Sequence, residues 1–175
     1  MTRRERRRGS AVLEFTLAGI PFIFIWISVA QMAIGMWRYH TIQYAVKTAG
    51  AYLTLHGADC SMGSNTCGIQ IKDAAKLLAS TAVGIDPTAM TVTFNAIDVD
   101  HTTVKSTVTC RLDACETNTT AWPPVNYNYP GNDVEIKTEY QFQSALAMFA
   151  PGPGAGAVQF GTIWFPGFTH QTILF

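Results

Sequence analysis

The chain has 175 residues, of which 48% are hydrophobic, and its 12 basic side chains balance 12 acidic ones. This length accommodates one membrane-spanning helix and one small domain, and it excludes two sizeable domains. Residues 1–9 hold five Arg and one Glu, a net charge of +4, so the rest of the chain carries −4. Most of the protein therefore lacks the basic face that nucleic-acid binding requires.

The first predicted element is a membrane-spanning helix. Between Glu14 and Arg38 about 23 residues pass without a charged side chain. At 1.5 Å per residue this run is roughly 34 Å long, enough to cross a hydrocarbon layer of about 30 Å. The arginines of residues 1–9 precede it, and basic residues are sparse beyond it. The positive-inside rule therefore places the amino end in the cytoplasm and the following domain outside the membrane.

Glu14 is a carboxylate at the start of this apolar run. An ionisable group inside the hydrocarbon layer costs about 2.5–3.5 kcal/mol on insertion scales, so such a residue is expected to have a partner. If the chain is cut after Gly9, the new amine lies on Ser10 and Glu14 becomes the fifth residue. The alternatives are a signal anchor with an incidental glutamate and a cleavable secretory signal. The secretory signal fits less well, because its apolar region has only about 7–15 residues.

The same helix is predicted to continue to residue 56, beyond its membrane-spanning part, which ends near residue 37. Trp37, Tyr39 and His40 form an aromatic cluster of the kind found at membrane interfaces. From Ile42 to Leu55 apolar residues recur at helical spacing, which predicts a stripe on which a domain packs. We expect a bend or local unwinding near Pro21.

Four cysteines lie beyond the membrane segment, at Cys60, Cys67, Cys110 and Cys115. Their even number agrees with an oxidising compartment, and three pairings are possible. We favour the two local bridges, because each closes a loop rich in Ser, Asn, Thr or Asp. Free thiols are the alternative, and a zinc site is less favoured because neither pair has two-residue spacing.

Residues 57–175 are predicted to form an α+β domain. Apolar residues at helical spacing predict a second helix over about 69–82, with one face made by Ile71, Ala74, Ala75, Leu78 and Ala79. Period-two alternation predicts strands over 90–97, 103–112 and 134–142. In the last of these the inward residues are Val134, Ile136, Thr138, Tyr140 and Phe142. No Asp, Glu, Lys or Arg follows Glu139. This tail is interpreted either as a strand that closes the sheet or as a surface left for a partner.

Candidate chemical sites are few. Asp98, Asp100 and His101 suggest a metal or acid–base site, but a hairpin turn is favoured because no convincing third ligand is present. No serine elbow, phosphate-binding glycine loop or helical His-Glu pair occurs. We therefore expect a protein that is not an enzyme and that holds no metal or cofactor.

The segment Arg7-Arg8-Gly9-Ser10-Ala11-Val12-Leu13-Glu14-Phe15, followed by Pro21, resembles the processing signal of type IV pilins. With the long helix and the strand Val134-Glu135-Ile136-Lys137-Thr138-Glu139-Tyr140 leading to an apolar end, the chain resembles TadE/TadG-type pseudopilins of the tight-adherence pilus system. The resemblance implies a pilin-like α+β fold, with a leader (1–9), a helix (10–56) and an extracytoplasmic domain (57–175).

The resemblance further implies cleavage between Gly9 and Ser10 by a prepilin peptidase and residence in the bacterial inner membrane. The domain would be periplasmic or extracellular, in a pilus assembled from other pilins by inner-membrane machinery for adherence or secretion. In this hypothesis Glu14 pairs with the Ser10 amine of a neighbouring subunit. The alternative is a single-pass anchored binding domain that does not polymerise and uses the aromatic loop at 122–130 as its contact surface.

Overall fold

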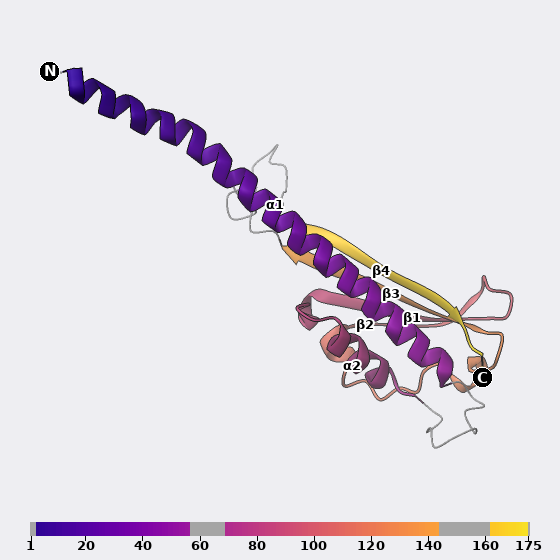
Figure 1. The fold of residues 1–175 in the computed structure, drawn as a ribbon. Helices are drawn as coiled ribbons and strands as arrows, with labels where there is room; N and C mark the ends of the chain where they lie inside the picture. Colours follow the sequence, from indigo (N-terminus) through magenta and orange to yellow (C-terminus); the bar gives the residue numbers. More distant parts are fainter. Residues whose placement is uncertain (1–2, 57–68, 144–161, 175) are drawn as a thin grey trace, which may run out of the picture.

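The computed structural model describes residues 3–56, 69–143 and 162–174 of the chain. The long helix α1 (Arg3–Leu55) lies on a small α+β domain with its carboxyl-terminal half and projects from it with its amino-terminal half (Figure 1). The domain contains α2 (Ile71–Thr81), η1 (Pro87–Ala89), β1 (Met90–Ile97), β2 (Val104–Arg111), α3 (Leu112–Cys115), η2 (Val125–Tyr127), β3 (Asp133–Gln143) and β4 (Thr162–Thr172). The predicted α+β class, with a long amino-terminal helix, a second helix and an antiparallel sheet, is confirmed.

Helix α1 has two halves with opposite surroundings. Its projecting half is continuous through Pro21, so the expected unwinding there is not observed. Its other half buries a stripe against the domain, made by Ile42, Ala45, Val46, Ala49 and Leu53. This is the stripe predicted from the helical spacing of apolar residues.

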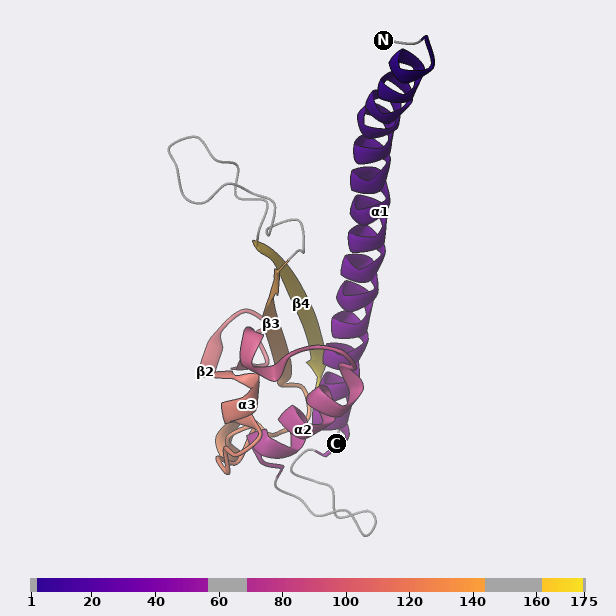
Figure 2. The same cartoon turned by 90° about the vertical axis from the view of Figure 1, so that its left-hand side faces the viewer.

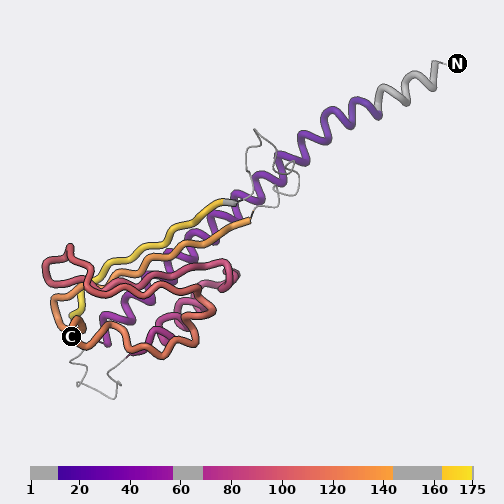
Figure 3. Tube along the Cα trace, turned by 180° about the vertical axis from the view of Figure 1, so that it is seen from behind, coloured from indigo at the N-terminus to yellow at the C-terminus, as the bar shows by residue number. Residues whose placement is uncertain are grey.

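The sheet is antiparallel, with strand order β2-β1-β3-β4. Figure 3 shows the strands running side by side along the carboxyl-terminal half of α1. The inner face of β3 is buried as predicted, at Val134, Ile136, Thr138, Tyr140 and Phe142. The uncharged tail forms β4, which pairs with β3 and packs beneath α1. The first interpretation of the tail, a strand that completes the sheet, is thus the observed one.

Two glycines allow α1 and β4 to approach closely. A Cβ on Gly167 of β4 would lie 2.8 Å from Ile42 Cγ2 of α1, and a Cβ on Gly50 of α1 would lie 2.7 Å from Thr169 Cγ2 of β4. Gln43 adds a polar contact, because its Nε2 donates to the Pro166 carbonyl at 2.8 Å. The helix is therefore part of the domain core and not only a tether.

Helix α2 packs beside α1 on the same side of the sheet (Figure 2). Its amino end carries a capping box in which the Gln70 backbone N–H donates to Asp73 Oδ2 at 3.0 Å. It buries Ile71, Ala74, Ala75 and Leu78, four of the five residues predicted for its apolar face. This burial connects α1, α2 and the sheet into one hydrophobic core.

Candidate functional site

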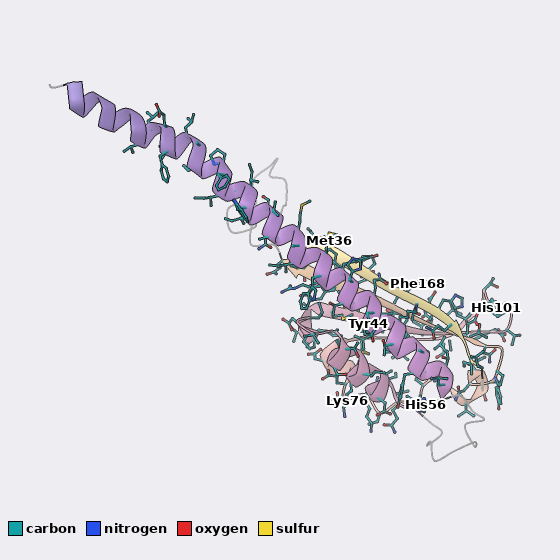
Figure 4. All side chains as sticks on the ribbon, viewed as in Figure 1. Met36, Tyr44, His56, Lys76, His101 and Phe168 are labelled. Carbon is teal, nitrogen blue, oxygen red and sulfur yellow. A yellow bond between two sulfur atoms is a disulfide. The ribbon has the colours of Figure 1, made fainter. Side chains whose placement is uncertain are left out.

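The projecting half of α1 is the most unusual surface of the molecule. Large apolar side chains stand out all round it (Figure 4). Phe15 and Leu17, for example, are 76% and 75% exposed. By length and composition, α1 from Val12 to Leu55 qualifies as a helix able to cross a membrane, and the most apolar part of this stretch is not buried by the rest of the chain. A continuous apolar surface of this extent requires lipid or protein cover.

Glu14 lies within this apolar surface. Its side chain is exposed and is flanked by Leu13 and Phe15, which are also exposed. Gly9 and Ser10 lie one to two turns earlier in the same helix. The helix therefore places a carboxylate on an apolar rod, well away from the folded domain. Cleavage between Gly9 and Ser10 stays a prediction.

One of the two predicted disulfides is present in the described residues. Cys110 at the end of β2 and Cys115 at the end of α3 are bonded, with Cα atoms 5.6 Å apart. This bridge closes the local loop that the sequence suggested. Cys60 and Cys67 lie outside the described residues, so their pairing stays a prediction.

The cluster at Asp98, Asp100 and His101 forms the hairpin turn between β1 and β2, as favoured from the sequence. Asp100 Oδ1 accepts the backbone N–H groups of Thr103 at 2.8 Å and Thr102 at 3.0 Å, and its Oδ2 accepts the Thr103 hydroxyl. These hydrogen bonds, those from Thr103 foremost, lower the pKa of Asp100. The carboxylate is thus used by the turn itself.

A buried carboxylate between two histidines escaped the sequence analysis. Asp133 begins β3 with a side chain only 2% exposed, and its Oδ2 contacts His101 Nδ1 from the turn and His170 Nε2 from β4, the latter at 2.8 Å. Burial raises the pKa of Asp133, but hydrogen bonds from Thr172, His101 and His170 together lower it below its ordinary value. This contact joins the turn to β4 at the end of the sheet remote from the projecting helix (Figure 4).

These three residues do not form a metal centre. Within residues 3–56, 69–143 and 162–174, no group of three or more His, Cys, Asp or Glu side chains is arranged to hold a metal ion. Both histidines meet the same carboxylate oxygen. The arrangement suits a structural link between strands.

The aromatic loop at 122–130, suggested as a contact surface for the anchored-domain alternative, is partly buried and partly exposed. Trp122 is 1% exposed and packs near Phe94, with ring centroids 6.3 Å apart. Tyr127 packs against the same core, whereas Val125 and Tyr129 are exposed. The loop therefore contributes its largest side chain to the hydrophobic core.

Comparisons with known proteins give no relative: no protein-family model, curated protein or solved structure matches this chain.

Proposed function

We propose that this chain is a pseudopilin or minor pilin of the tight-adherence type, anchored by the projecting half of α1 and assembled with other pilins through Glu14. One observation carries the proposal. The exposed apolar segment projects from the folded domain and is not buried by it. It holds a carboxylate near its amino end. Such a segment matches a subunit whose helix lies first in lipid and then in a bundle of neighbouring helices.

The energetics give Glu14 a role in register. In lipid the carboxylate costs about 2.5–3.5 kcal/mol, and the helix amino terminus offsets only ~0.3–1 kcal/mol of this. If the chain is cut after Gly9, the Ser10 amine is largely protonated at neutral pH and supplies a compensating charge. An ion pair between Glu14 of one subunit and Ser10 of the next forms only when the two helices have the correct stagger. The pair therefore selects one arrangement of subunits.

Cleavage is tested by amino-terminal sequencing and intact-mass measurement of the membrane-bound protein. We expect a mature chain that starts at Ser10. A mature protein that retains Met1 and the arginines overturns the proposal and favours the anchored domain that does not polymerise.

Assembly is tested with Glu14→Ala. A buried ion pair that loses one partner costs about 3–5 kcal/mol, so we expect incorporation into pili to fall by about a hundredfold or more while membrane insertion is unchanged. Thr16→Ala is the matched control, because this exposed residue is two positions away and its hydroxyl bonds only within the helix, to Val12 O at 2.7 Å and Leu13 O at 3.1 Å. Sheared-pilus yield and carbonate-resistant membrane retention are measured together. Wild-type pilus incorporation of Glu14→Ala contradicts the role of the carboxylate.

A further inference from the structure

We propose that a polar pocket at the membrane-facing end of the domain binds the headgroup of a phospholipid that carries both a phosphate and an amine. The pocket has a volume of about 470 Å³ and is bounded by Arg38 of α1, the connection from α2 to β1, and the end of β3. It exists because β3 runs on to Gln143, whereas β1 begins at Met90 opposite Tyr140. The last residues of β3 therefore lack a β1 neighbour, and the corner is open.

Arg38 provides the anion-binding group of this pocket. Its Nη1 donates to the Tyr140 hydroxyl at 3.0 Å, and its guanidinium lies 5.1 Å from the centre of the Phe142 ring. Among the described residues it forms no ion pair with a carboxylate, and its Nε is buried without a hydrogen-bond partner there. A guanidinium presents a planar set of donors that matches a phosphate. Arg38 is thus held in place with donor capacity left over.

The position of Arg38 along α1 identifies lipid as the source of the phosphate. This step rests on the proposed membrane-spanning role of the helix. Arg38 follows Glu14 by 24 residues, about 36 Å along the axis, whereas the hydrocarbon layer is about 30 Å thick and the whole bilayer about 40–45 Å. With Glu14 at the inner boundary, Arg38 falls in the opposite headgroup layer. The ring of Trp37 packs against Gly84, which lines the pocket. An aromatic residue of the kind found at membrane interfaces thus lies beside the pocket.

Asp86 gives the pocket its second charge. This carboxylate lines the same pocket and is oriented by Thr88, whose backbone N–H and hydroxyl donate to Oδ1 at 2.9 Å and 2.8 Å. An anion bound to Arg38 is disfavoured by Asp86, unless the ligand also carries a cation. A headgroup such as phosphoethanolamine pairs with both charges, its phosphate with Arg38 and its ammonium with Asp86. Phosphatidylglycerol or inorganic phosphate pairs only with Arg38.

The test uses the full chain reconstituted in nanodiscs that contain equal amounts of phosphatidylethanolamine and phosphatidylglycerol. The protein is then extracted in mild detergent, and native mass spectrometry counts the lipids that remain bound. We expect retained phosphatidylethanolamine to exceed phosphatidylglycerol, and Arg38→Gln to lower its retention about tenfold or more. Lys47→Gln is the matched control, because Lys47 is an exposed cation nine residues further along α1 and its loss should change nothing. Retention by Arg38→Gln at the wild-type level overturns the proposal.

Asp86→Asn tests the amine contact separately, because asparagine keeps the oxygen that accepts from Thr88. We expect this variant to retain the two lipids equally, and an unchanged preference overturns the assignment of the amine even if Arg38→Gln does not fold. Displacement of the lipid by inorganic phosphate would identify a site for free anions and would also overturn the proposed headgroup site. Carbonate extraction of every sample separates this inference from the proposed function. A chain that does not insert refutes the membrane role of α1, whereas an inserted chain without lipid preference refutes only the headgroup site.

Discussion

Replacing Gly167 with alanine tests whether α1 is part of the domain core. The added Cβ would lie 2.8 Å from Ile42 Cγ2 and 3.1 Å from Val46 Cγ2, and closer still to Thr138 Oγ1. Carbon atoms pack best at about 3.5–4.0 Å, so α1 must move away from β4 or the side chains must leave their rotamers. All three neighbours are buried, and none has solvent to move into. Overpacking of this kind costs typically about 1–3 kcal/mol.

The assay is thermal unfolding of the full chain in detergent, monitored by circular dichroism. For a chain of this size 1 kcal/mol corresponds to roughly 2–4 °C, so we expect Tm to fall by about 2–12 °C. Gly35→Ala is the matched control, because its Cβ would meet only Phe165 Cζ, at 3.4 Å. Thr138→Ala in the Gly167→Ala background removes the nearest atom and should restore part of the loss. An unchanged Tm for Gly167→Ala would show that helix and strand do not lie in the described contact.

Three further predictions concern the domain. Truncating the fully buried Leu53 to alanine should cost about 2–5 kcal/mol, whereas Leu55→Ala, at an exposed position of the same helix, should stay within about 0.5 kcal/mol; urea unfolding compares them. Replacing Cys110 and Cys115 together by serine should lower the free energy of unfolding by about 2 kcal/mol, the chain-entropy value for a short closed loop. The measurement is the shift of the urea unfolding midpoint at constant slope. Because the pKa of Asp133 is lower in the folded protein than its ordinary value, its carboxylate stabilises the fold above about pH 4, and this stability should be lost as the pH falls further. Asp133→Asn should therefore make the free energy of unfolding less dependent on pH below about pH 4. An equally steep dependence in the variant would contradict the argument.

Elements with a regular pattern of burial could be predicted from the sequence. In strand β3, apolar or small inward residues alternate with polar ones from Val134 to Phe142, and from Ile136 onward the inward residues are buried while the outward ones are exposed or half-buried. The stripe from Ile42 to Leu53 has helical spacing because α1 buries a single face. In both cases local periodicity and tertiary burial agree, so the residues alone indicate the element and its inward side.

Strand β4 shows where periodicity fails. Its inward positions include Gly167 and Thr169, which are small because α1 approaches the backbone there, so no alternation of large apolar residues marks the strand. Pro166 is tolerated because β4 is an edge strand. Since the register of β4 was not predictable, neither was the meeting of His170 with Asp133. The burial of Trp122 was also not predictable, because no local pattern indicates that its loop packs on the core.

The lengthwise contact between α1 and β4 has a mechanical consequence. Successive points along the helix meet successive points along the strand, from Gly35 against Phe165 to Gly50 against Thr169. A pull on the projecting rod would therefore load these contacts in shear, all at once, instead of peeling them apart in turn. In a fibre of the proposed kind, tension along α1 would pass directly into the sheet. The α+β domain would then stay attached to the projecting half of α1.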